Sequence, residues 1–176
     1  MSVRNLSRVT LFTALMAICS WISVPAPVPF TLQTFAVFLV PGLLGGKLGT
    51  VAVGTYLLLG AVGLPVFSGF SGGIGALLGA TGGYLLGFLL TTLVIWLAEV
   101  VLGNSQTVFL ASAIVGQGLC YLFGSMWYAL GYAGGTAELP AVLSACVLPF
   151  LLPDTAKLIL ALILRKRLAP VLAKSR

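Results

Sequence analysis

Two oppositely charged residues, Asp154 and Lys157, interrupt a long apolar stretch near the C-terminus. Their spacing of three places both side chains on one face of a helix, where the carboxylate can accept hydrogen bonds and the ammonium group can donate them. Ionisable side chains inside apolar segments are costly and commonly mark ligand or ion sites. The pair therefore indicates recognition of a small polar ligand. The alternative is an internal ion pair that only fixes one helix in its bundle.

Catalytic chemistry has few candidate residues in this chain. There is no histidine, and the only carboxylates are Glu99, Glu138 and Asp154. This set provides no paired acids, no histidine-based triad and no metal cluster. We therefore expect a protein that is not an enzyme, with no catalytic residue and no metal site. Glu99 and Glu138 lie near predicted segment ends, where solvated charges need no special role.

Cysteine and nucleotide motifs add no further chemistry. Cys19, Cys120 and Cys146 are odd in number, have no CxxC spacing and lie in predicted helices. Such cysteines pack as small apolar side chains, and no cofactor is expected. The glycine-rich stretch 42–48 has the wrong spacing for an ATP-binding loop and lacks the hydroxyl that holds magnesium. Energy from ATP would have to come from a partner chain.

The composition indicates that lipid surrounds these residues. The chain has 176 residues, of which 60% are hydrophobic and 7% are charged, and its mean hydropathy is +1.17. A soluble domain of this size cannot bury that much apolar surface. We predict an all-α integral membrane protein in which residues 1–176 form a single substrate-binding domain.

Glycine, proline and polar clusters divide the apolar sequence into six predicted transmembrane helices. Their expected ranges are 6–25, 33–46, 48–62, 80–102, 107–132 and 140–168. The second and third ranges are too short to cross a membrane upright, because about 14 residues span only about 21 Å of a roughly 30 Å core. Their ends are expected to pack inside the protein or to line a cavity.

The basic residues predict the orientation of these helices. Lysine and arginine collect in cytoplasmic loops. Here eight of the nine lie at the start of the first helix, between the second and the third, and at or after the end of the sixth. With six spans, both termini are then cytoplasmic and the loops 63–79 and 133–139 face outward. The net charge of +6 is thus a topology signal and does not indicate nucleic-acid binding. A multi-pass protein of the cell membrane is expected.

Two further regions carry polar groups suited to a ligand site. The glycine-rich loop 67–84 contains Ser71, Gly73 and Tyr84, and glycine lets the backbone approach a ligand closely. The alternative is a plain flexible external loop.

The proline-rich stretch 25–34 predicts an extended path leading to Gln33 and Thr34. Capping and turn formation by its threonines are about as well supported as ligand contact. Gln117 is predicted at the depth of Asp154. It is expected to bond to a neighbouring helix, the alternative being a place in the pocket.

Several strings resemble one transporter family, and they occur in order over nearly the whole chain. They are PVPFTLQTFAVF at 27–38, GGKLG at 45–49, GLPVF at 63–67, GATGGYLLGF at 79–88 and PDTAK at 153–157. The chain resembles the BioY family, the biotin-binding S components of energy-coupling factor (ECF) transporters.

The resemblance implies a six-helix S-component fold that captures biotin from outside with high affinity. It also implies partners, namely a transmembrane coupling protein and two cytoplasmic ABC ATPases. It assigns Asp154 and Lys157 to the ureido head group of biotin. The pocket is expected to include these residues together with Tyr84, Ser71, Gly73, Gln33 and Thr34.

The sequence departs from the family pattern at two places. Some members carry a basic residue directly after the glycine-glycine-tyrosine string, suited to the biotin carboxylate, where this chain has Leu85. S components also tend to carry two alanines four residues apart on the first helix for docking. The nearest versions here are Thr10 with Ala14 and Thr13 with Ala17.

Two functions of other classes remain alternatives to the transporter subunit. One is a self-sufficient carrier of biotin or another small solute that is driven by an ion gradient. The other is a membrane scaffold that transports nothing.

Overall fold

The computed structural model describes residues 2–24, 30–135 and 138–174, which are almost entirely helical. The main helices are α1 (Val3–Trp21), α2 (Gln33–Leu44), α3 (Gly46–Ala61), α5 (Gly82–Leu102), α6 (Gln106–Met126) and α8 (Leu148–Lys174). Shorter elements are strands β1 (Ser23–Val24) and β2 (Phe30–Thr31), a 3₁₀ turn η1 (Ser68–Phe70), helix α4 (Ile74–Leu78), a π-helical end of α6, η2 (Trp127–Tyr132), and α7 (Leu139–Cys146). Each of the six predicted helical ranges contains a helix.

Two predicted boundaries are wrong. The first helix ends at Trp21 rather than at 25, because residues 23–24 pair with residues 30–31 as a short antiparallel hairpin. The range 140–168 is not one helix. It divides at Val147 into α7 and α8, whose axes differ in direction by 45°, and α8 continues to Lys174. Pro149 follows the break at the start of α8, a position where the missing N–H of proline costs no helical hydrogen bond.

Length and composition identify two segments of the described chain that can cross a membrane, Gly82–Leu102 and Gln106–Tyr132. The bent pair α7 and α8 makes a third if it is counted as one span. Helix α2 is apolar but has 12 residues, so at about 1.5 Å per residue it cannot cross upright. The expectation of a short second helix is confirmed, whereas the total of six spans stays a prediction.

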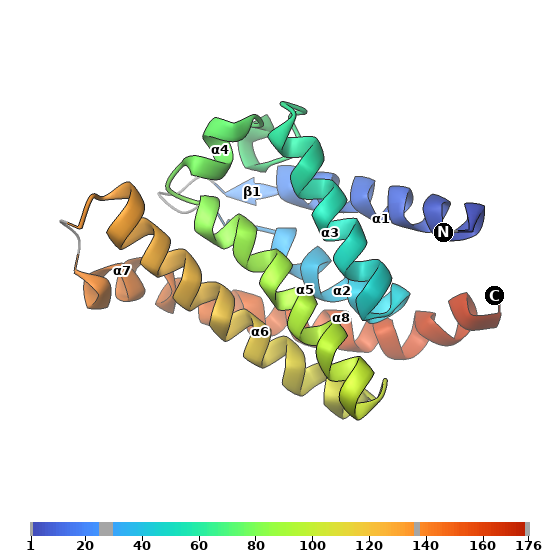
Figure 1. The fold of residues 1–176 in the computed structure, drawn as a ribbon. Coiled ribbons are helices and arrows are strands. Elements are labelled where there is room, and N and C mark those ends of the chain that lie inside the picture. The colour runs from blue at the N-terminus through green and yellow to red at the C-terminus, as the bar shows by residue number, and fades with distance from the viewer. Residues whose placement is uncertain (1, 25–29, 136–137, 175–176) are drawn as a thin grey trace.

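The helices form a bundle in which the start of α1 and the end of α8 lie at the same end (Figure 1). Helix α5 runs alongside α6, and α2 packs between α3 and α8. The loop that carries α4 and helix α7 lie at the opposite end (Figure 1). Large apolar side chains such as Leu97, Val101 and Leu152 face outward, as expected where lipid replaces water.

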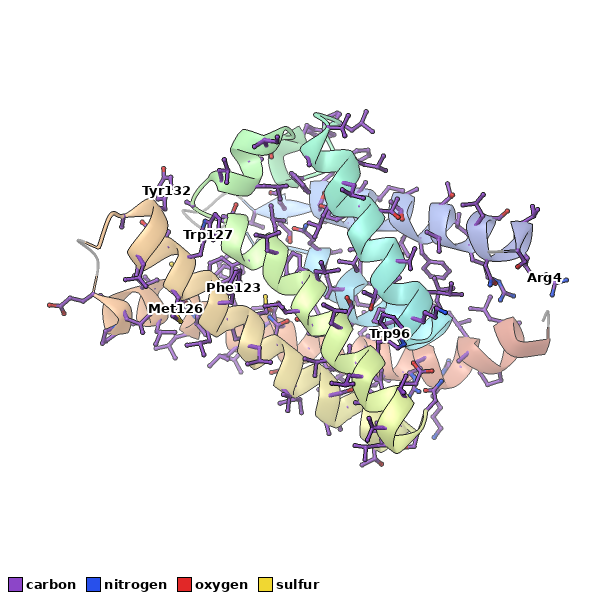
Figure 2. The ribbon with its side chains drawn as sticks, in the orientation of Figure 1. Arg4, Trp96, Phe123, Met126, Trp127 and Tyr132 are labelled. Carbon is purple, nitrogen blue, oxygen red and sulfur yellow. The ribbon has the colours of Figure 1, made fainter. Side chains whose placement is uncertain are left out.

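Small residues allow α5 and α6 to approach closely. A Cβ atom added at Gly87 would lie 2.6 Å from Cys120 Sγ, and one added at Gly124 would lie 2.3 Å from the Tyr84 ring. Trp127 packs on Gly83 and donates its ring N–H to the carbonyl oxygen of Gly79 at 3.1 Å, on the side of α6 that faces the start of α5 (Figure 2). Glycine spaced at four residues is a common device for tight packing of membrane helices.

Glu99 has a structural role that the sequence did not predict. Its carboxylate accepts a hydrogen bond from the backbone N–H of Gly46, the first residue of α3. Helix N-termini carry unpaired N–H groups and a positive partial charge, so a carboxylate there is stabilising. Gly46 itself packs against the backbone of Trp96 on α5, which leaves no room for a side chain (Figure 2).

Arg165 is buried, although it belongs to the basic cluster that predicted the cytoplasmic side. Its guanidinium group donates hydrogen bonds to oxygen atoms of Gly42, Asn104, Ser105 and Gln106. These acceptors lie near the end of α2 and in the turn between α5 and α6. Arg165 therefore joins three segments that are far apart in the sequence.

Candidate functional site

A cavity of about 320 Å³ lies between the loop after α3 and helices α2, α5, α6, α7 and α8. Its lining combines an apolar wall with a group of polar side chains. The lining residues are Thr31, Gln33, Thr34, Ser68, Ser71, Ala76, Gly79, Thr81, Tyr84, Leu85, Phe88, Gln117, Cys120, Tyr121, Cys146, Phe150, Asp154 and Lys157. A few polar groups in a mostly apolar cavity of this size are typical of a small-molecule site.

Asp154 lies at the centre of the polar group and is 4% exposed. Its Oδ1 atom accepts hydrogen bonds from Thr34 Oγ1 at 2.8 Å and from Lys157 Nζ at 2.7 Å. Its Oδ2 atom accepts from Tyr121 at 2.7 Å and from Gln117 Nε2 at 3.3 Å. Four donors thus stabilise a buried carboxylate, which offsets much of the cost of removing it from water.

Lys157 completes the ion pair that the spacing predicted. Its Nζ atom contacts Asp154 and also donates to Thr34 Oγ1 at 2.9 Å. These bonds use two of the three N–H groups of the ammonium. Because Lys157 lines the cavity, the third N–H is available to an acceptor on a ligand.

The predicted site residues come together only in part. Gln33 and Tyr84 line the cavity, but each already holds a polar partner, since Gln33 Nε2 donates to Tyr56 at 2.7 Å and the Tyr84 hydroxyl lies 3.0 Å from Ser125 Oγ. Tyr84 therefore offers its ring to the cavity more readily than its hydroxyl.

The two predicted residues of the glycine-rich loop behave differently from each other. Ser71 lines the cavity, and its hydroxyl donates to the carbonyl oxygen of Ser68 at 2.8 Å. Gly73 does not belong to the described cavity lining. Its φ of 92° and its N–H bond of 2.7 Å to Gly60 place it at the turn that starts α4. The loop is also not wholly irregular, because it contains η1 and α4.

The proline-rich stretch lies mostly outside the described residues, which omit 25–29. Its described end pairs as β2 with β1, in the register Ser23 to Thr31. Thr31 both lines the cavity and accepts the backbone N–H of Gln33 at 3.1 Å. Thr31 therefore has the turn-forming role, whereas ligand contact by the threonines stays a prediction.

Several lining residues were not predicted. Tyr121 follows Gln117 by four residues, so the two share a helix face and both reach Asp154. That spacing was the one available signal. Cys120, Cys146 and Phe150 line the cavity as apolar side chains, with Phe150 stacked on Phe30 at 4.2 Å between ring centroids. Nothing in their local sequence distinguishes them from core residues.

Known proteins similar to this chain belong to one transporter family. The sequence profile of the BioY family matches residues 1–174. The biotin transporter BioY of Thermotoga maritima is 45% identical over 168 residues, which cover 94% of this chain and 96% of that protein. The probable biotin transporter BioY of Pyrococcus horikoshii is 41% identical over 169 residues, covering 96% and 98%.

A solved structure agrees with the fold. The S-component for biotin from an ECF-type ABC transporter superposes with a TM-score of 0.82 at 30% identity, covering 94% of this chain and 90% of that one. The S-component fold implied by the resemblance is thereby confirmed. The relatives are transporters, so the expectation of a protein that is not an enzyme is confirmed as well. With a profile match over nearly its full length and relatives that it covers almost end to end, the chain belongs to the BioY family.

Proposed function

We propose that this protein is a high-affinity biotin-binding S component of an ECF-type vitamin uptake transporter. The observation that carries the proposal is the cavity in which the buried pair Asp154 and Lys157 lies beside an apolar wall. Biotin matches that combination, because it joins a polar cyclic urea to a sulfur-containing ring and an aliphatic chain. Binding of this kind requires no covalent chemistry.

The polar group of the cavity suits the ureido head. A urea presents two N–H donors and a carbonyl acceptor, and the third N–H of Lys157 is available to that carbonyl oxygen. Asp154 holds Lys157 in place through the ion pair, and its negative charge favours ligand N–H groups nearby. Thr34 bridges both charged residues and so belongs to the same group.

The remainder of the cavity suits the rings and the aliphatic chain. Phe88, Phe150, Cys120 and the ring of Tyr84 supply apolar contacts. Gln33 and Ser71 supply polar atoms elsewhere in the lining, and Gly73 acts by shaping the loop that carries Ser71.

For the membrane arrangement we propose six spans, with both termini in the cytoplasm of the cell and the loop that carries α4 outside. The distribution of lysine and arginine supports this topology. So does the position of the start of α1 and the end of α8 at one end of the bundle, opposite the α4 loop (Figure 1). Biotin would then enter the cavity from outside the plasma membrane.

The proposed partners are a transmembrane coupling protein and two cytoplasmic ABC ATPases. The name of the structural relative, an S-component from an ECF-type ABC transporter, supports this assembly. On α1, Thr13 and Ala17 are buried and Thr13 donates to the carbonyl oxygen of Ala52. Thr10 and Ala14 are exposed. The pair Thr10 and Ala14 is therefore the version of the docking motif that a partner helix can reach.

Calorimetric titration of biotin into the purified, ligand-stripped protein in detergent tests the proposal. Riboflavin and thiamine serve as control ligands, and Asp154→Asn and Lys157→Ala as variants. We expect tight binding of biotin alone, weakened at least about tenfold by either substitution. A folded, monodisperse protein that fails to bind biotin would contradict the proposed function.

A further inference from the structure

Among the buried side-chain nitrogen and oxygen atoms in the described part of the chain, one has no hydrogen-bond partner, and its residue lines the cavity. This atom is Gln117 Oε1. Gln117 is 8% exposed and lines the cavity beside Asp154. A buried amide oxygen without a donor loses its hydration and gains nothing in return, which costs free energy. Such an atom in a ligand site indicates that the ligand supplies the donor.

The direction of the Gln117 amide follows from its neighbour. Its Nε2 atom lies 3.3 Å from Asp154 Oδ2. A carboxylate only accepts hydrogen bonds, so turning the amide over would place Oε1 against another acceptor oxygen. Asp154 therefore selects the orientation in which Oε1 points away from the carboxylate.

Asp154 itself has little capacity left for a ligand. Each of its oxygen atoms already accepts two hydrogen bonds, from Thr34 and Lys157 on one side and from Gln117 and Tyr121 on the other. A carboxylate oxygen offers about two lone-pair positions. A ligand N–H would have to displace one of these donors, whereas Gln117 Oε1 is free.

Gln117 also borders a second cavity of about 230 Å³ that lies between α6 and α8 and includes Ile114, Gly118 and Leu151. A water molecule there is the competing partner for Oε1. The ligand cavity is favoured because it also holds Lys157, which has an N–H free for a carbonyl oxygen. A donor and an acceptor together match one face of a cyclic urea, whose carbonyl and N–H groups are adjacent.

We propose that Gln117 Oε1 accepts one ureido N–H of biotin and that Asp154 acts as the positioning residue that orients the Gln117 amide. This assignment rests on the proposed function, since it concerns the same ligand in the same cavity. It separates two roles: Lys157 and Gln117 touch the head group, while the carboxylate arranges them. Gln117 is then a determinant of specificity for a ligand with an N–H at that position.

A double-mutant cycle between protein and ligand tests the assignment. Gln117→Met keeps the length of the side chain and removes the acceptor. Tyr121→Phe is the matched control, because it removes the other donor to Asp154 Oδ2 without removing the free acceptor. Each protein is titrated with biotin and with the two analogues that are methylated at one ureido nitrogen.

For one of the two analogues we expect methylation to weaken binding to the unaltered protein by at least about tenfold. The same methylation should cost less than about threefold in Gln117→Met, because the hydrogen bond is already absent, and should keep its full cost in Tyr121→Phe. Should Gln117→Met not yield a folded protein, Gln117→Leu takes its place in the cycle.

Equal methylation costs in the unaltered protein and in Gln117→Met, for both analogues, would overturn the assignment. In that case Oε1 does not receive a ureido N–H, and biotin binding itself still stands. If the unaltered protein binds no biotin, the proposed function fails and this assignment fails with it. The two failures are thus distinguished within one set of titrations.

Discussion

Thr34 Oγ1 lies 2.8 Å from Asp154 Oδ1, although 120 positions separate the two residues in the sequence. The contact joins α2 to α8, and Lys157 reinforces it by donating to the same threonine hydroxyl. The charged pair on α8 is thereby tied to a second helix. The polar group of the cavity therefore depends on the packing of the bundle as much as on the pair itself.

Removal of Asp154 is predicted to destabilise the protein more than removal of Lys157. Asp154→Leu leaves Thr34, Gln117 and Tyr121 without their buried acceptor and Lys157 without a counter-charge, at a cost of about 3–5 kcal/mol. Lys157→Met leaves the Asp154 carboxylate with three of its four donors, so its cost is smaller. Thermal unfolding of the biotin-free variants in detergent measures the difference. A larger loss for Lys157→Met would mean that the ion pair dominates the stability of the site.

The free acid of biotin and its amide are predicted to bind with affinities within about tenfold of each other. Lys157 is the one cation among the described lining residues, and it is engaged by Asp154, so no basic group is left for the biotin carboxylate. Competition calorimetry with biotinamide measures the preference. A free acid favoured by a hundredfold would contradict this account.

Leu85→Arg is predicted to create a preference for the free acid. Leu85 lines the cavity at the place where some members of the family carry a basic residue. A guanidinium there can form a charge-assisted hydrogen bond with the carboxylate. Leu85→Met controls for the change in shape. The ratio of the affinity for free biotin to the affinity for biotinamide should rise only in the arginine variant.

Gly87→Val is predicted to force α5 and α6 apart and to lower the unfolding free energy by about 1–3 kcal/mol. A Cβ atom there would lie 3.0 Å from Cys120 Cα, which is backbone and cannot turn aside. Gly118→Ala on α6 is the control, since nothing lies within 4 Å of its added Cβ. It should be neutral or stabilising by up to about 1 kcal/mol, because alanine is the better helix former. Thermal unfolding measures the loss of stability. The affinity for biotin shows whether moving α5 away from α6 also changes the cavity.

Arg165→Lys is predicted to lower thermal stability without changing the affinity for biotin. Lysine keeps the charge, but its ammonium group cannot donate to Gly42, Ser105 and Gln106 at once as the planar guanidinium group does. The loss should be about 1–3 kcal/mol, because at least one buried acceptor is left unpaired. Arg167→Lys, at an exposed position two residues further on, should leave the melting temperature unchanged. Equal effects of the two substitutions would exclude the role assigned to Arg165.

The sequence by itself determined the family and the charged pair that lines the cavity. Apolar stretches with few charges, separated by glycine and proline, predict apolar helices. These signals are local, because each depends only on residues close together in the chain. The spacing of Asp154 and Lys157 predicted their ion pair for the same reason, since residues three apart in a helix always share a face. The five short sequence strings that resemble the BioY family, which occur in the same order along the chain, predicted the family.

The tertiary structure alone decided which residues surround that pair. Tyr121 and Gln117 reach Asp154 only because α6 packs beside α8, and no local pattern states which helices are neighbours. Gly73 was predicted to belong to the pocket, but it lies outside the described cavity lining, at the turn that starts α4. In the sequence Arg165 belongs to the basic cluster that predicts the cytoplasmic side. In the structure it is buried where three segments meet. Helix propensity and hydropathy are properties of one segment, whereas hydrogen-bond partners and cavity walls arise from contacts between segments that are far apart in the chain.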